Sequence, residues 1–175
     1  MLETIIIIIA LLIAGVLVYA ASRPNAFRME RTATINAPAE KIFPFINDFH
    51  KWAAWSPWEK LDPALQRSYA GPQNGKGAIY EYEGNNKVGA GRMEITESTP
   101  SSRVLTTLDF LRPMRAHNFA EFTLVPQGGA TVVTWAMYGR SPYMAKLMTI
   151  FVSMDKLVGK QFDEGLANLK AVAEK

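Results

Sequence analysis

The chain has 175 residues, of which 49% are hydrophobic, and a formal net charge of +3 at pH 7. It contains no cysteine, which excludes disulfides, thiol nucleophiles, iron–sulfur clusters and cysteine-ligated zinc. Only two histidines are present, His50 and His117, so a multi-histidine metal site is excluded, and Lys and Arg form no basic block that predicts a nucleic-acid partner.

The first 21 residues form a distinct apolar segment, in which 18 residues are hydrophobic. Thr4 to Ala21 reads TIIIIIALLIAGVLVYAA and carries no charge. As a helix rising about 1.5 Å per residue, it spans roughly 27 Å, which is enough to cross the apolar core of a bilayer. We therefore expect a transmembrane anchor over residues 1–21. A cleaved signal peptide and a buried core helix are the alternatives, but Glu3 stands where a signal peptide carries Lys or Arg, and the apolar run is unusually long for one.

The charges beside this segment predict its orientation. Arg23, Arg28 and Arg31 follow it, whereas only Glu3 and the terminal amine precede it. The positive-inside rule therefore predicts a single-pass membrane protein whose C-terminal domain is cytoplasmic. Residues 22–26, SRPNA, form a short linker that keeps the domain, residues 27–175, close to the membrane surface.

The following residues show strand patterns separated by turn signals. Phe27 to Ile35 alternates as a half-buried strand does, and Asn36 to Glu40 carries helix-start signals. A helix is expected there, with a second short one near His50 to Ala54. Six further strands are expected, bounded by turns rich in Gly, Pro and Asn, at Leu65–Ala70, Ala78–Glu83, Gly91–Ser98, Arg103–Phe110, Arg115–Val125 and Thr131–Tyr138.

A long C-terminal helix is expected from Pro142 to Ala173, where apolar residues recur at helical spacing. Its first half, Tyr143 to Val158, is apolar nearly all round and rich in methionine. Such a segment suits the flexible wall of a cavity or contact with the membrane, unless loops or a dimer partner cover it. The oligomeric state stays open.

Consecutive strands with short connections predict an antiparallel sheet of seven strands with one face to cover. A helix of about 30 residues is long enough to cross that face. When a curved sheet wraps around one helix, the space between them need not fill completely, and a ligand would lie there. The expected fold class is therefore α+β.

This arrangement resembles the helix-grip fold of the START-like, or SRPBCC, superfamily, in its polyketide cyclase/dehydrase and lipid-transport branch. The resemblance runs from about Phe27 to Lys175 and rests on TINAPAEKIFPFINDFHKWAAWSPW, GRMEITESTPSSRVLTTLDF, AEFTLVPQGGATVVTWAMYG and GLANLKAVAE. It implies a curved seven-stranded antiparallel sheet wrapped around a long C-terminal helix. Similar proteins include lipid carriers, hormone-binding proteins and aromatic-ring cyclases, without a universal catalytic motif, so we assign no catalytic residue, metal or cofactor.

Aromatic residues and methionines supply the candidate ligand-binding side chains. The segment KWAAWSPWEK carries three tryptophans, which either wall an apolar cavity or plug the end of the sheet. Tyr80 and Tyr82 share one face of their strand, as do Trp135 and Met137, because side chains alternate along a strand. The expected ligand-binding residues are Trp55, Trp58, Tyr80, Tyr82, Trp135, Met137, Met148 and Phe151.

The titratable residues form no convincing catalytic set, since strand phasing places His117, Glu121 and Glu94 toward solvent. We therefore expect a membrane-anchored protein that binds a hydrophobic small molecule, lipid or polyketide-like, between its sheet and its C-terminal helix. One alternative is a polyketide cyclase or dehydratase, which would need His50, Asp109 or Glu94 inside the cavity. The other is a non-enzymatic interaction or stress-response module with a filled interior and an exposed apolar patch.

Overall fold

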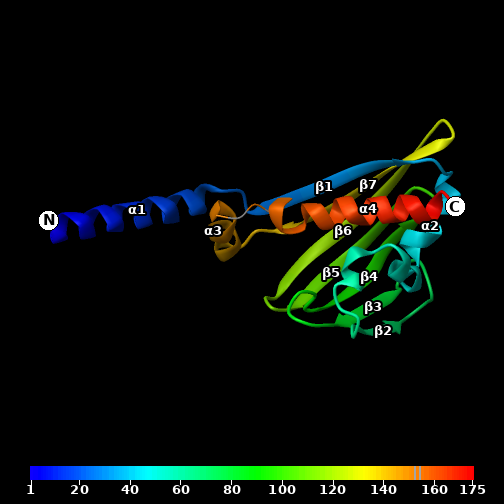
Figure 1. Cartoon of the computed structure of the whole chain (residues 1–175), viewed down its shortest axis with the longest axis horizontal. Helices are drawn as coiled ribbons and strands as arrows, with labels where there is room; N and C mark the ends of the chain where they lie inside the picture. Colours follow the sequence, from blue (N-terminus) through cyan, green and yellow to red (C-terminus); the bar gives the residue numbers. More distant parts are fainter. Residues whose placement is uncertain (152, 154) are drawn as a thin grey trace.

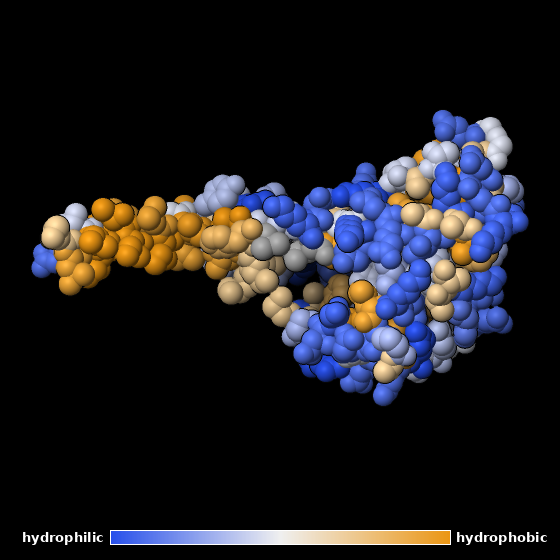
Figure 2. Space-filling model, in the orientation of Figure 1, coloured by the Kyte–Doolittle hydropathy of each residue, from blue (hydrophilic) through white to orange (hydrophobic). Residues whose placement is uncertain are grey.

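The N-terminal helix α1 (Leu2–Ser22) extends away from the rest of the chain in the computed structural model, which describes residues 1–151, 153 and 155–175 (Figure 1). By length and composition, α1 is apolar enough to cross a membrane. Nearly all of its side chains are exposed, as the orange surface of Figure 2 shows. The prediction of a long apolar helix at this end of the chain is confirmed.

Seven strands form one antiparallel sheet, as predicted. Its spatial order is β1-β7-β6-β5-β4-β3-β2, so the strands from β2 to β7 form a meander and β1 is added beside the last strand. Two register shifts in β4, at Ala90/Gly91 and Ile95/Glu97, mark irregularities of the kind that bend a strand. The strands are β1 (Ala26–Ile35), β2 (Gln66–Ala70), β3 (Ile79–Glu83), β4 (Ala90–Thr99), β5 (Arg103–Arg112), β6 (Ala116–Gln127) and β7 (Ala130–Arg140).

One face of the sheet is covered by helices. Between β1 and β2 the chain forms α2 (Ala39–Asn47) and two short 3₁₀ helices, η1 (Phe49–Ala54) and η2 (Pro57–Lys60). The last helix, α4 (Lys160–Ala173), runs across the same face and packs against α2, η1, η2 and β1. This arrangement is the helix-grip architecture expected from the resemblance.

The C-terminal helix is divided, which differs from the continuous helix predicted over Pro142 to Ala173. The chain forms α3 (Tyr143–Phe151), a π-helical turn η3 (Asp155–Gly159) and α4. The expected helix also included Val152 and Met154, which lie outside the described residues. α4 lies on the sheet, whereas α3 packs beside α1 (Figure 1). The physical reason lies in how apolar each helix is. α3 is apolar nearly all round and packs on the apolar surface of α1, whereas α4 is amphipathic and needs to bury only one face, which it does on the sheet.

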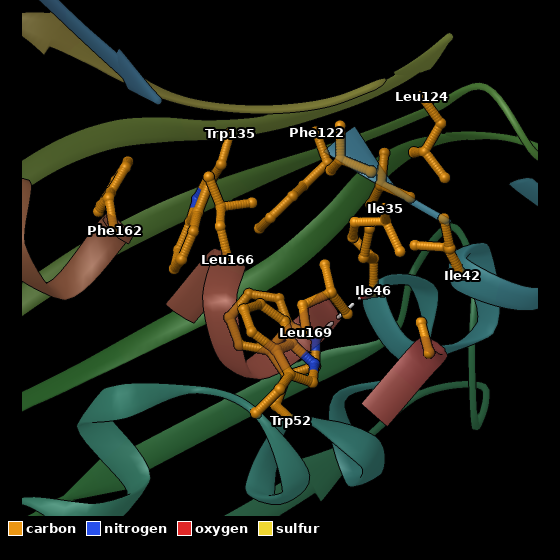
Figure 3. Packing of buried hydrophobic residues seen from close by; sticks show 14 of the residues in the cluster. Ile35, Ile42, Ile46, Trp52, Phe122, Leu124, Trp135, Phe162, Leu166 and Leu169 are labelled. Atoms are coloured by element: carbon orange, nitrogen blue, oxygen red, sulfur yellow. Dashed lines mark hydrogen bonds between the residues drawn. The ribbon is translucent and has the colours of Figure 1, made fainter. Parts of the chain in front are cut away.

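The core lies between the sheet and α4 (Figure 3). Phe162, Leu166 and Leu169 of α4 follow helical spacing and are all buried, so they present one continuous face to the strands. Trp52 and Trp55 are fixed by hydrogen bonds from their indole nitrogens to the backbone oxygens of Ile46 (3.0 Å) and Phe45 (2.9 Å). These bonds satisfy the polar atom of each buried indole and hold η1 against α2.

Candidate functional site

An apolar cavity of about 130 Å³ lies between the inner face of the sheet, η1 and η2, and the beginning of α4. Figure 2 shows the body hollowed at the end that faces α1, with apolar side chains visible in the hollow. The strands β3 to β7 supply half of the lining residues, because every second side chain of a strand points inward. The lining residues are Trp52, Ser56, Trp58, Glu59, Leu65, Tyr80, Tyr82, Val88, Met93, Leu108, Phe110, Ala120, Trp135, Met137, Val158 and Phe162.

Three aromatic rings form the wall of the cavity beneath α4. Trp135 of β7 stacks on Phe162 of α4, with ring centroids 4.2 Å apart, and Trp58 of η2 meets both rings edge-on at 5.6 and 6.0 Å. Edge-to-face and stacked pairs of this kind add to the apolar burial of each ring. The wall is therefore held in place by elements that are far apart in the sequence.

Two glycines permit this close packing. A Cβ atom on Gly165 would lie 2.7 Å from Cζ3 of Trp135, so the helix approaches the indole only because residue 165 has no side chain. A Cβ atom on Gly91 would lie 2.5 Å from the hydroxyl oxygen of Tyr82. Gly91 thus allows the Tyr82 ring to lie flat over β4.

One charged group lines this apolar space. The side chain of Glu59 is only 5% exposed. It accepts a hydrogen bond from the Tyr80 hydroxyl at 2.5 Å and another from Arg67 Nε at 2.6 Å. Arg67 compensates the buried carboxylate, and the hydrogen bond to Glu59 raises the pKa of Arg67. The result is a polar corner at Glu59 and Tyr80 in a largely apolar cavity.

The two tyrosines of β3 stay protonated at neutral pH. Burial raises the pKa of Tyr82 to about 12. Burial, followed by the hydrogen bond to Glu59 and its negative charge, raises the pKa of Tyr80 further. Trp135 also carries a polar atom, Nε1, which is buried and has no hydrogen-bond partner among the described residues. The Tyr80 hydroxyl already donates to Glu59, whereas Trp135 Nε1 and the Tyr82 hydroxyl are donors that an acceptor atom on a ligand would complement.

The cavity brings together five of the eight expected ligand-binding residues: Trp58, Tyr80, Tyr82, Trp135 and Met137. Trp55 is fully buried and lies outside the lining that the described residues form. Its ring packs edge-on against Phe122 and Trp135 and supports the wall from behind. Trp55 therefore lies behind the cavity wall, and its role in ligand binding stays a prediction.

Met148 and Phe151 also lie away from the cavity. Both were expected there because one continuous helix would have carried them over the sheet. They belong instead to α3, where Met148 is 50% and Phe151 73% exposed. The division of the C-terminal helix is the reason why they lie away from this cavity, and their role in ligand binding stays a prediction.

The acid and base candidates of the sequence lie outside the cavity. His50 contacts Asp48 at 3.0 Å and stacks on Tyr69, beside a separate shallow cleft. His117 and Asp109 pair across β5 and β6 with Nδ1 and Oδ1 2.5 Å apart, and the His117 side chain is exposed as expected.

Another candidate, Glu94, pairs with Arg92 at 2.8 Å, in agreement with the predicted surface role. The carboxylate that lines the cavity among the described residues is Glu59, which sequence reasoning missed. It follows Trp58 in a short 3₁₀ helix, where no periodic pattern indicates which side chain points inward.

An antiparallel sheet that grips a helix over an apolar cavity defines the helix-grip class of ligand-binding folds. The chain belongs to the family described as polyketide cyclase / dehydrase and lipid transport, whose model matches residues 26–174. No curated protein matches the chain.

Several solved structures share the fold. The di-domain ARO/CYC BexL from the BE-7585A biosynthetic pathway is similar over 90% of this chain and 53% of BexL, with a TM-score of 0.64 and 16% identity. A protein from Thermobifida fusca has a TM-score of 0.58 and 21% identity over 83% of this chain and 92% of its own. Protein CV1439 from Chromobacterium violaceum has a TM-score of 0.57 and 16% identity over 87% and 99%. Identities this low establish the fold alone.

Proposed function

We propose that this protein binds an apolar small molecule, a lipid or polyketide-like compound, in the cavity between the sheet and α4, and that α1 anchors it in a membrane. The observation that carries the proposal is the cavity itself, whose lining is apolar except for Ser56, Glu59 and the hydroxyls of two tyrosines. An apolar wall with a few polar groups at one place is the usual composition of a small-molecule site. The polar corner at Glu59 and Tyr80 would orient a ligand that carries a hydroxyl or carbonyl group.

The volume of the cavity limits what it admits in this conformation. An engineered apolar cavity of roughly 150 Å³ binds benzene, so 130 Å³ accommodates a ring or a short acyl segment. A larger ligand would require neighbouring side chains to move, and the flexible thioethers of Met93 and Met137 are suited to that. Burying six methylene groups would contribute about 5 kcal/mol before the costs of binding.

Native mass spectrometry of the full chain, released from mild detergent, tests this proposal. We expect apolar adducts that organic extraction recovers. Ala120→Phe should abolish them, because Ala120 lines the cavity. Ala171→Phe adds the same ring at an exposed position on α4 and should retain them. A wild-type chain without adducts that also takes up no added fatty acid or aromatic polyketide would contradict the proposal.

The pair Glu59 and Tyr80 supports a second candidate function, a cyclase or dehydratase. Glu59 would take a proton from carbon, the carbanion would form a C–C bond to a carbonyl carbon, and Tyr80 would protonate the new alkoxide and recover its proton from Glu59 across their 2.5 Å hydrogen bond. In a second round Glu59 would take the other proton of that carbon and Tyr80 would protonate the departing hydroxyl, which leaves as water and restores both groups. Incubation with a poly-β-ketone thioester, followed by absorbance, would reveal ring formation. Glu59→Gln should then abolish turnover while retaining adducts in native mass spectrometry. Equal rates in the wild type and Glu59→Gln would refute this function.

The proposed anchor has its own test, because a signal sequence has the same length and composition. Carbonate washing of membranes should leave the full-length chain in the pellet, with an intact N-terminus by mass spectrometry. The positive charges that follow α1 support a cytoplasmic body. Protease added to sealed, right-side-out vesicles should therefore leave the body intact, and digestion from that side would overturn the orientation.

A further inference from the structure

A second apolar surface lies outside the cavity, at the end of the body that faces α1 (Figure 1). Part of it is one face of α3, where three residues at helical spacing are exposed. The other part is the turn between β5 and β6. We call these residues the membrane-facing rim; their exposed fractions lie between 50 and 73%, and they are Leu111, Met114, Met144, Met148 and Phe151.

The membrane-facing rim is structurally continuous with α1. The Tyr143 hydroxyl of α3 donates a hydrogen bond to the backbone oxygen of Leu17 at 3.0 Å. Leu17 lies five residues before the end of α1, which is roughly 7 Å along the helix axis. A helix joined to α1 at that depth lies at the boundary between the lipid headgroups and the acyl chains when α1 spans a bilayer.

Basic residues surround the membrane-facing rim. Arg115 follows Met114 in the β5–β6 turn, Arg112 ends β5 and pairs with Glu83 at 3.0 Å, and Arg23 follows α1 directly. Arginine beside exposed apolar side chains is typical of surfaces that enter the interface of a membrane with anionic lipids.

Lining residues of the cavity lie next to the rim along the chain. Phe110 lines the cavity, and the next residue, Leu111, belongs to the rim. Val158 lines it from η3, which lies between α3 and α4 along the chain. The hollow in Figure 2 lies at this end. An apolar molecule that leaves the cavity here would meet lipid rather than water.

We propose that the membrane-facing rim inserts into the headgroup region of an anionic bilayer, so that ligands exchange directly between the bilayer and the cavity. This inference rests on the proposed anchoring by α1 and on the proposed ligand site. It adds a second membrane contact, formed by α3 and the β5–β6 turn, and it identifies the source of the ligand as the membrane.

Single-cysteine labelling tests this contact cleanly, because the natural chain has no cysteine. Leu12→Cys in α1, Met114→Cys in the rim and Val125→Cys on β6 are each labelled with an environment-sensitive fluorophore. Val125 is the matched control, since it is 58% exposed against 60% for Met114 and lies toward the opposite end of the sheet. The full chain is reconstituted in vesicles of phosphatidylglycerol and phosphatidylcholine that contain a lipid with a nitroxide on its headgroup or at the top of its acyl chain.

We expect the Met114→Cys label to shift to shorter wavelength and to be quenched at least threefold more than the Val125→Cys label. Vesicles of phosphatidylcholine alone should weaken this quenching. If the labels at positions 114 and 125 are quenched equally and weakly while the Leu12→Cys label lies deep in the bilayer, the rim contact is overturned and the anchor remains. A label at position 12 that remains in water would overturn the anchor and, with it, the rim contact. A blue-shifted but unquenched label at position 114 would show a second copy on the rim and would also overturn the proposal.

Discussion

Replacing Ala120 by leucine should stabilise the protein and close the ligand site together. Ala120 is buried on β6, lines the cavity and pairs with Thr106 on one side and Met137 on the other. At about 24 cal/mol per Å³, a cavity of 130 Å³ represents roughly 3 kcal/mol of packing that the fold does not use. A leucine side chain adds three carbon atoms, whose burial contributes about 2.4 kcal/mol.

Ordering the leucine side chain reduces this gain by about 0.5 to 1 kcal/mol, so the expected increase in the free energy of unfolding is about 1.5 kcal/mol. Urea unfolding of the full chain in mild detergent, followed by tryptophan fluorescence, measures it. All four tryptophans lie in the body, so the signal reports on the domain that carries the cavity. At an m-value of about 2 kcal/mol/M, the midpoint should rise by roughly 0.7 M.

The matched control is Ala171→Leu, which adds the same atoms to an exposed position on α4 and should shift the midpoint little. Ala120→Val tests the same space with a smaller side chain. A loss of more than about 1 kcal/mol in both Ala120 variants, with apolar adducts retained, would refute the reasoning. It would mean that the space beside Ala120 cannot be filled and is not where the ligand lies.

Three further changes test the packing and charge of the site. Gly165→Ala improves helix propensity by about 1 kcal/mol but forces Trp135 to move, so we expect a net loss of about 1 to 2 kcal/mol by urea unfolding, and a gain would refute the close contact. Tyr80→Phe removes the donor to the Glu59 carboxylate and should cost about 1.5 to 3 kcal/mol; an unchanged midpoint would show that this bond contributes nothing. Burial raises the pKa of Tyr82 to about 12 in the folded state, so the Tyr82 hydroxyl loses its proton at a lower pH in the unfolded chain than in the folded one. The free energy of unfolding should therefore fall between pH 10 and 12, by up to about 2.7 kcal/mol. Tyr82→Phe should remove that share of the decline, and identical pH profiles would contradict the assignment.

The sheet could be predicted from the sequence because each inward face is encoded by simple alternation. Trp135 and Met137 share a face, as do Tyr80 and Tyr82, and the structure places all four on the cavity. Side-chain direction along a strand depends on local geometry alone, so the pattern needs no knowledge of distant residues. This is why these four lining residues followed from the sequence.

The errors arise where contacts between distant elements decide the outcome. Met148 and Phe151 follow the same helical spacing as Phe162, and nothing local indicates that α3 packs beside α1 while α4 stays on the sheet. Glu59 faces the cavity because Arg67 and Tyr80 hold it there. A buried carboxylate depends on partners that only the tertiary structure supplies, so its sequence position resembles an ordinary surface charge.

The pairing of β1 with β7 joins the first strand of the body to the last one. During synthesis β1 emerges directly after α1, but its partner follows about a hundred residues later. At about 5 to 20 residues per second, β1 would wait for several seconds or more beside the membrane with its edge unpaired. Loss of β7 by truncation would leave that edge exposed on a chain that already carries its apolar N-terminal helix. We therefore expect C-terminally truncated chains to associate through β1 or be degraded rather than persist as partly folded domains.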